Sequence, residues 1–249
     1  MKLINYLLNI LTDLFASSTR KPTKTTSTKP KGKNKIRVST ISKKSTKKNK
    51  AISKRKKQSN KLKDTKLIVI DPGHGGADTG AVFVNPATHL PAILEKQAAL
   101  ETSLTLKYLL THKYGWKIRL SRSTDIRPRY SYRTGIANRQ KADAFVSIHF
   151  NSPGTYGLVY YAAEQPRPNS KRLAEILDKY LGFNKVWKST QSRFKRLYID
   201  DVSTSIPSVL IEVDPIDAYA GTKEYRLQKA KAIAAALNEF FTKEENGHD

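Results

Sequence analysis

The chain has 249 residues, enough for one substantial domain and an appendage. It contains no cysteine, which excludes disulfide bonds and thiolate-bound metals, so any bound metal must be held by His, Asp or Glu. The formal net charge is +25, but residues 20–66 carry 20 basic residues and one acidic residue, a net of +19. The rest of the chain is therefore only mildly basic.

Residues 1–17 place apolar side chains at helical spacing. These side chains are Leu3, Ile4, Leu7, Leu8, Leu11, Leu14 and Phe15. The run is shorter than the roughly 20 apolar residues of a membrane-spanning helix. Lys2 and the small residues after Phe15 resemble a secretory signal peptide. Asn9 and Asp13 interrupt the apolar stretch, which favours an amphipathic helix on a membrane or partner instead, and both interpretations stay open.

Residues 18–65 consist mainly of Lys, Ser, Thr, Pro and Asn. A segment with so few large apolar groups cannot offset the entropy cost of ordering, so we expect a disordered linker or tail. It is either a solvated tether or a binding segment for a polyanion, such as nucleic acid, an anionic membrane surface or an acidic wall polymer. A basic run does not choose among these partners. Residues 244–249 are predicted to form a short C-terminal tail.

The region 66–243 alternates short apolar runs with stretches of helical periodicity. Strands are predicted at 67–70, 117–120, 144–149, 158–162 and 208–213, and helices at 94–114, 130–142, 169–181 and 223–241. This alternation predicts a single α/β domain with a mostly parallel or mixed sheet and helices on both faces.

Three ionisable residues occupy comparable places in this plan. His74 follows the first predicted strand, His149 ends the third, and Glu212 lies at the end of the last one. The carboxyl ends of strands in an open α/β sheet line the ligand crevice, so these side chains are candidates for one site. Glu95 is a fourth candidate, in the first turn of a helix, where the helix dipole favours a carboxylate.

This combination of residue types suits a catalytic zinc site. Zinc commonly takes three protein ligands from His and carboxylates and leaves a fourth position for water. A carboxylate that is not a ligand can then move the proton of that water during amide hydrolysis. Each residue also has an ordinary interpretation, as a structural His or as a carboxylate held by hydrogen bonds. Asp214 is an alternative to Glu212, because residues two apart on a strand face the same side. We expect Ser147 to face away from His149, which would leave no serine–histidine pair.

The segment from Leu67 to Ala81, LIVIDPGHGGADTGA, resembles the opening motif of the zinc-dependent N-acetylmuramoyl-L-alanine amidases, which include cell-division amidases and phage lysins. The similarity covers about residues 66–241. It continues through Glu95-Lys96, Leu120-Ser121-Arg122 with Asp125, Arg133, Ala137-Asn138, Ala142–Asn151, Gly157–Tyr161 and Ile206–Glu212.

The resemblance implies that His74, Glu95 and His149 bind Zn²⁺ and that Glu212 is the catalytic carboxylate. It also implies that the substrate is peptidoglycan, cut between N-acetylmuramic acid and L-alanine. Further family positions with structural or substrate-contacting roles are Arg122, Arg133, Asn138 and Asn151. Asp71 either orients His74 or stabilises the turn that follows it.

Two departures from the family pattern bear on function. The family usually continues after the catalytic acid with a Gly-Phe-type stretch, whereas this chain has Val213–Asp217, which affects the rim of the site. The connection from His149 to Leu158 is too short for the blocking helix of regulated members, so we expect no obligate protein activator. The protein is expected either to be exported to the periplasm or cell wall or to be encoded by a phage and act on a host wall. The alternative function is a non-catalytic protein that binds the wall or a polyanion through its basic tail.

Overall fold

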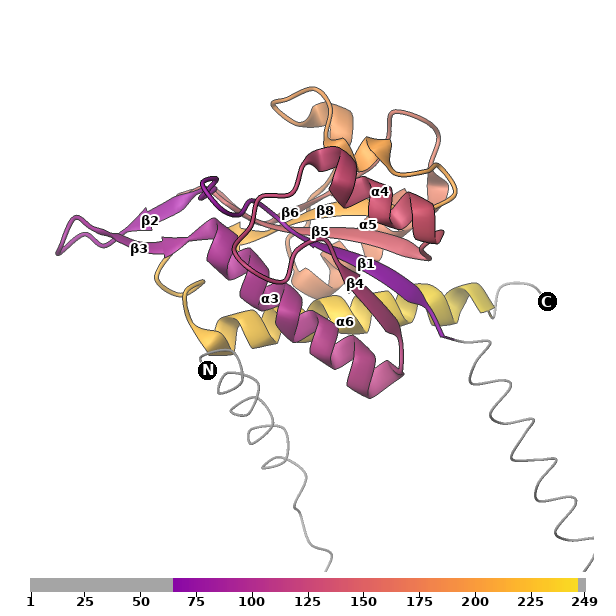
Figure 1. The fold of residues 1–249 in the computed structure, drawn as a ribbon, viewed down its shortest axis with the longest axis horizontal. Helices are drawn as coiled ribbons and strands as arrows, with labels where there is room; N and C mark the ends of the chain where they lie inside the picture. The colour runs from indigo at the N-terminus through magenta and orange to yellow at the C-terminus, as the bar shows by residue number, and fades with distance from the viewer. Residues whose placement is uncertain (1–64, 246–249) are drawn as a thin grey trace, which may run out of the picture. The chain divides into compact units, whose positions relative to one another are not determined.

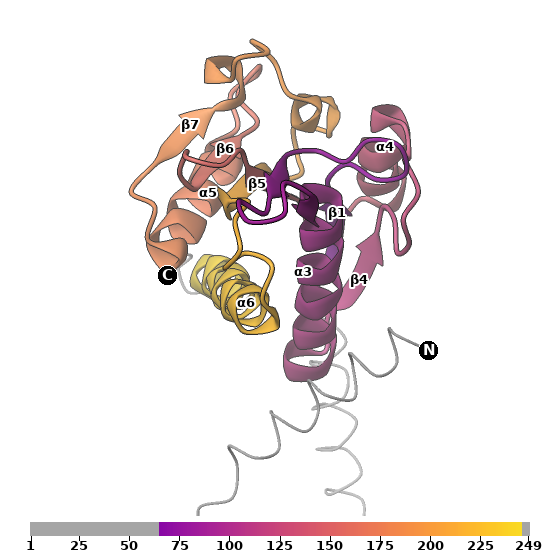
Figure 2. The same cartoon turned by 90° about the vertical axis from the view of Figure 1, so that its left-hand side faces the viewer.

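A six-stranded sheet forms the centre of the described domain, with the order β4-β1-β5-β8-β6-β7 (Figures 1 and 2). The computed structural model describes residues 65–245, with side chains to residue 242. The strands are β1 (Leu67–Pro72), β4 (Lys117–Leu120), β5 (Ala144–Asn151), β6 (Leu158–Tyr161), β7 (Val186–Lys188) and β8 (Ser208–Pro215). Strands β4, β1, β5 and β8 are parallel, and β6 pairs antiparallel with β8 but parallel with β7. The predicted mixed, mostly parallel α/β sheet is confirmed.

Helices cover both faces of this sheet, as predicted (Figure 2). The helices are α3 (Glu95–Leu109), continued by a π-helical turn at Leu110–Tyr114, α4 (Tyr130–Gln140), α5 (Pro168–Leu181) and α6 (Lys223–Glu245). Helices α3, α5 and α6 pack together on one face. The other face is covered by α4 and by the short 3-10 helix η3 (Tyr198–Asp201). None of the helices within residues 65–245 has the length and hydropathy required to span a membrane.

The strands supply both cores because successive side chains point to opposite faces. Ile68 and Ile70 of β1 enter the larger core with α3, α5 and α6, whereas Val69 enters the smaller core beneath α4. Coverage of both faces explains why the central strands are apolar almost throughout, instead of alternating with polar residues.

Several short elements were not predicted. Strands β2 (Val82–Val84) and β3 (Pro91–Leu94) form a separate antiparallel hairpin, and the 3-10 turn η2 (Ser189–Gln191) follows β7. Elements of three or four residues carry too little periodicity to separate them from loops. The predicted segment 1–17 and the predicted disordered stretch up to residue 64 lie outside the described residues. The same is true of residues 246–249 of the predicted tail.

The topology brings the carboxyl ends of β1, β5 and β8 to one edge of the sheet, because these three strands are parallel neighbours. His74 follows the end of β1, and His149 and Glu212 are paired positions near the ends of β5 and β8. Glu95 reaches the same edge as the first residue of α3.

Candidate metal centre and active site

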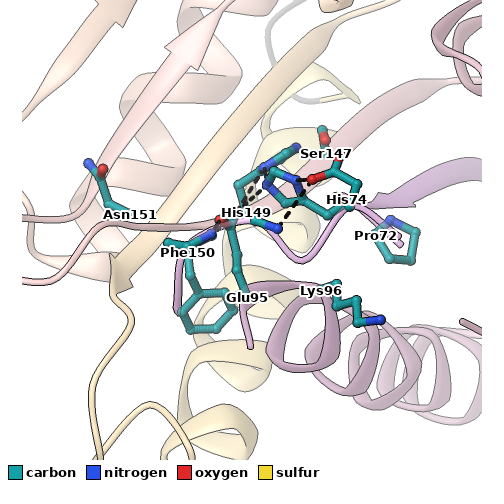
Figure 3. Close-up of polar contacts among 12 residues, drawn as sticks. Pro72, His74, Glu95, Lys96, Ser147, His149, Phe150 and Asn151 are labelled. Atoms are coloured by element: carbon teal, nitrogen blue, oxygen red, sulfur yellow. Dashed lines mark hydrogen bonds and ion pairs between the residues drawn. The ribbon is translucent and has the colours of Figure 1, made fainter. Parts of the chain in front are cut away.

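Three side chains converge at this edge of the sheet (Figure 3). His74 Nε2 lies 2.9 Å from Glu95 Oε1, His149 Nδ1 lies 3.0 Å from the same oxygen, and the two nitrogens are 3.1 Å apart. Each residue thus offers one ligand atom to a common point, an arrangement that can hold a metal ion. We call His74, Glu95 and His149 the ligand cluster. The structure therefore brings together the three residues predicted as ligands.

Glu95 is held from two directions by backbone groups. The amide of Phe150 donates to Oε1 at 3.0 Å, and the amide of Ala81 donates to Oε2 at 2.8 Å. The side chain is buried, which by itself raises the pKa of a carboxyl group, but hydrogen bonds and charge from His149 and His74 lower the pKa of Glu95 below its ordinary value. The carboxyl group is thus kept ionised, as a metal ligand must be.

Asp78 orients His74. His74 Nδ1 lies 2.9 Å from Asp78 Oδ1, which leaves Nε2 to face Glu95 and His149. Burial lowers the pKa of His74, but Glu95 and Asp78 together raise it above its ordinary value. A carboxylate on the far nitrogen of a ligand His fixes its tautomer and ring orientation. Asp78 was not predicted for this role, although its place four residues after His74 in the same glycine-rich turn was a usable clue.

Asp71 does not orient His74 and instead belongs to a buried network beneath His149. Its Oδ1 accepts a hydrogen bond from Arg133 at 2.8 Å and another from Ser121. Its Oδ2 accepts from Tyr198 at 2.6 Å and from Ser147 at 2.9 Å. The expectation that Asp71 acts on His74 is therefore corrected, because Asp78 occupies that position.

Tyr198 connects this network to His149. Its hydroxyl oxygen lies 3.3 Å from His149 Nε2. Burial raises the pKa of Tyr198 well above its ordinary value, so the phenol stays protonated and donates a hydrogen bond to Asp71. When Nδ1 of His149 binds a metal, Nε2 carries the ring proton and can donate a hydrogen bond to the phenol oxygen. No pattern in the sequence indicated Tyr198, which is the first residue of the short 3-10 helix η3.

Ser147 lies on the same face of β5 as His149, contrary to expectation, because the two residues are two positions apart and not adjacent. The hydroxyl of Ser147 bonds to Asp71 and Tyr198 and makes no bond to His149. A serine–histidine pair is absent from this part of the described structure, as predicted, but for a different reason.

Glu212 lies beside the cluster without joining it. It pairs with His149 across β5 and β8, and its Oε2 is buried with no hydrogen-bond partner among the described residues. Burial raises the pKa of Glu212 to about 7, and the negative charge of Glu95 adds to this effect. The competing acid Asp214 bonds to the Tyr225 hydroxyl and forms an ion pair with Lys229 at 2.6 Å, so it is engaged against α6.

The remaining predicted residues hold loops in place. Arg122 donates to the carbonyls of Gly73 (2.6 Å) and Lys96 (2.7 Å), and Arg133 donates to the carbonyl of His74 (2.7 Å). Asn138 binds the loop that carries Tyr198, through the Asp201 carbonyl at 3.0 Å and the Ser203 amide at 2.8 Å. Asn151, the last residue of β5, donates to the carbonyl of Tyr156 in the loop that follows, at 3.1 Å. The contacts of these four residues support a structural role for each of them.

A cavity of about 280 Å³ adjoins the ligand cluster. Its lining residues are His74, Asp78, Arg127, Pro128, Arg129, Tyr130, Arg133, His149 and Tyr198. The cluster thus borders a hollow of molecular size, on the side where α4 begins.

Comparisons with known proteins give the same family for the whole domain. Residues 68–239 match the model of the N-acetylmuramoyl-L-alanine amidase family. An uncharacterized cell wall amidase of Bacillus anthracis is 32% identical over 216 residues, which make up 78% of this chain and 38% of that protein. The probable cell wall amidase LytH of Staphylococcus epidermidis is 31% identical over 192 residues, 74% of this chain and 61% of LytH.

Solved structures agree with this assignment. The catalytic domain of the amidase CwlV from Bacillus (Paenibacillus) polymyxa is 27% identical with a TM-score of 0.61, and the match covers 72% of this chain and 99% of that domain. The amidase AmiC2 of Nostoc punctiforme is 27% identical with a TM-score of 0.59, over 72% of this chain and 98% of that structure. The chain spans little more than a third of several curated relatives, such as 35% of the amidase CwlM of Bacillus licheniformis. Because the matched region fills most of the chain and holds the whole cluster, this protein belongs to the N-acetylmuramoyl-L-alanine amidase family.

Proposed function

We propose that this protein is a zinc-dependent amidase of peptidoglycan, which hydrolyses the bond between N-acetylmuramic acid and the L-alanine of the stem peptide. The observation that carries the proposal is the His74–Glu95–His149 cluster with the unpartnered Glu212 beside it. The nature of the ligands supports zinc, because two imidazoles and one carboxylate are a common ligand set of catalytic zinc. Tetrahedral bonds of about 2.0–2.1 Å place ligand atoms roughly 3.3 Å apart, close to the 2.9–3.1 Å found here.

The orphan oxygen of Glu212 supports its role as the proton carrier. A bound zinc ion would polarise the substrate carbonyl and lower the pKa of a water molecule toward about 7. Glu212 accepts the proton of the attacking water and passes it to the leaving nitrogen of L-alanine. No covalent intermediate is required.

A non-catalytic wall-binding protein was the alternative interpretation. The supporting interactions of the cluster favour the enzyme, since Asp78, Tyr198 and two backbone amides orient the ligands in the way a working metal site requires. Polyanion binding by the basic tail stays a prediction, because that segment lies outside the described residues. Residues 152–157 join β5 to β6 without a helix, which supports the prediction that no activator is needed.

Mass spectrometry of digested peptidoglycan tests this function. The expected products are free stem peptides that begin with L-alanine, lost on treatment with a chelator and restored by added zinc. Glu212→Gln should abolish turnover while the protein still binds one zinc ion, and Glu175→Gln, on the exposed surface of α5, serves as the control. Products that retain muramic acid on the peptide, or loss of zinc in the Glu212 variant, would contradict the assigned roles.

A further inference from the structure

The cavity beside the ligand cluster contains two arginines to which the chemistry above gives no role. Arg127 and Arg129 lie in the segment before α4, and both are exposed. The same cavity is also lined by His74 and His149 of the ligand cluster. A molecule that binds there therefore contacts the arginines and lies next to the reacting centre.

The charges in this cavity favour an anion. Arg133 is buried and its donors are taken by Asp71 and by backbone carbonyls. Asp78, the one acid among the lining residues, is already bonded to His74. The donors of Arg127 are largely open, because its side chain is 60% exposed and its one ion pair, to Asp78, is 3.6 Å long. Among residues 65–242, whose side chains the structure describes, Arg129 makes no side-chain hydrogen bond or ion pair.

The shape of the cavity favours part of a peptide. Pro128 and the Tyr130 ring, which stacks on Tyr198 with centroids 4.7 Å apart, add apolar surface to the lining of the cavity. A volume of about 280 Å³ is at the lower end for small-ligand sites, so it suits a short segment of a longer substrate. Guanidinium groups bind carboxylates through paired, charge-assisted hydrogen bonds.

We propose that Arg127 and Arg129 bind a free carboxylate of the stem peptide, close to its L-alanine residue. This inference rests on the amidase function proposed above. In that reaction the carboxyl group of the sugar is consumed in the amide bond that is cut, so the nearest free carboxylate belongs to the peptide. A phosphate of a wall polymer has similar chemistry, but it is not tied to the reacting amide. The protein is therefore selective for walls whose second stem residue keeps its carboxyl group free.

The test uses uncross-linked glycan strands without wall polymer, prepared in two forms. In one form the second stem residue carries a free carboxyl group, and in the other it carries an amide of nearly the same shape. The expected kcat/KM is about tenfold higher for the free acid, the effect of one exposed charge-assisted interaction. Because the strands contain no phosphate, a wall polymer cannot produce this difference.

Arg129→Gln is the decisive variant, because Arg127 contacts Asp78 and its replacement can disturb His74. Because Arg127 stays in place, the variant should lower the ratio of the two kcat/KM values severalfold toward one, by slowing cleavage of the acid form alone. Arg129→Lys should keep part of the preference. Arg139→Gln, which removes one exposed positive charge near the other end of α4, should keep all of it.

Equal cleavage of the two forms by the unmodified protein would overturn the inference. So would an Arg129→Gln variant that slows both forms equally, since this indicates a structural role. Cleavage of neither form would contradict the amidase function itself, together with the inference that rests on it.

Discussion

Each side chain of the ligand cluster has a second contact that fixes its direction. Asp78 holds His74, Tyr198 holds His149, and two backbone amides hold the carboxylate of Glu95. Such contacts define the tautomer and the ring orientation before a metal arrives, so less order has to be created on binding. The affinity of the site for zinc should therefore depend on residues that do not touch the metal.

Tyr198→Phe tests this dependence. The variant removes the oxygen that accepts the hydrogen bond from His149 Nε2, and zinc affinity should fall by about tenfold or more. Competition with a zinc-binding dye measures the change. Tyr132→Phe, in an exposed position on α4, is the matched control and should have no effect. Unchanged affinity in Tyr198→Phe would show that His149 does not need this contact.

The buried Glu212 makes the stability of the metal-free protein depend on pH. Burial raises the folded-state pKa of Glu212 from 4.5 to about 7, so the folded protein keeps a proton that the unfolded chain releases. This contribution is fully present below pH 4.5 and is lost as the pH rises through about 7.

Glu212→Gln carries no titrating group at this position. Relative to the unmodified protein, its free energy of unfolding should therefore increase as the pH rises from 4.5 to about 7, by roughly 3 kcal/mol at most. Urea unfolding of both proteins in chelator, at several pH values, measures the difference. A difference that does not change with pH would mean that Glu212 is not desolvated.

The sequence indicated the four central residues because each one stands at a strand end or helix start. His74, His149 and Glu212 follow apolar runs, and Glu95 opens a periodic helix. Tyr198 could not be found in this way, since its position depends on how a loop from the far end of the chain folds back over β5. The error on Ser147 had a simpler cause, because residues two apart on a strand share a face.

At the scale of elements, the loop after β1 approaches the cluster so closely that only glycine fits at certain positions. Gly80 has a φ of +64°, and a Cβ atom there would lie 2.5 Å from Glu95 Oε2 and 2.6 Å from His74 Cδ2. The same is true of Gly73, where a Cβ atom would lie 2.5 Å from the ring of His149. These glycines allow the loop to pack directly against the ligands.

Gly80→Ala should displace Glu95 and His74 and weaken zinc binding by about tenfold or more, as measured by calorimetric titration. Gly115→Ala provides the control for backbone strain, because Gly115 has a similar φ of +74° with no atom within 4 Å of the added Cβ. Both variants should lose some stability, and only the first should lose zinc affinity. Equal zinc affinities would mean that the loop can move away at no cost.

Long elements with a clear period were predictable, and short ones were not. The predicted helix at 169–181 matches α5 within one residue because its apolar face repeats over several turns. The hairpin of β2 and β3 has strands of three and four residues, which lie between prolines and loop-forming residues. Its pairing is decided by its contact with the rest of the domain, and a local pattern does not contain that information.

At the scale of the molecule, charge and catalysis belong to separate parts of the chain. Residues 20–66 carry a net charge of +19, whereas the ligand cluster and both cores lie within residues 67–242. The sheet order could not be predicted from the sequence, because β8 lies between β5 and β6 in the sheet and pairs with both, although it follows both in the chain. That order is what places Glu212 next to His149.

A truncated protein of residues 66–249 should therefore still release stem peptides from purified peptidoglycan, without any added partner protein. Release of dye from labelled walls at low ionic strength gives the rate. The rate on intact walls should fall with salt less steeply than for the full chain, since the basic segment is missing. Activity that appears only when a second protein is added would contradict the prediction of independence from an activator.

The proposed mechanism requires that His74, Glu95 and His149 bind one zinc ion while Glu212 stays free beside it. The most direct measurement is anomalous diffraction from crystals of the zinc-loaded protein, recorded on both sides of the zinc absorption edge. We expect one peak about 2.0–2.2 Å from one atom of each of the three ligands, with both oxygens of Glu212 beyond bonding distance. A zinc ion bonded to Glu212 in place of Glu95, or a peak away from this edge of the sheet, would contradict it.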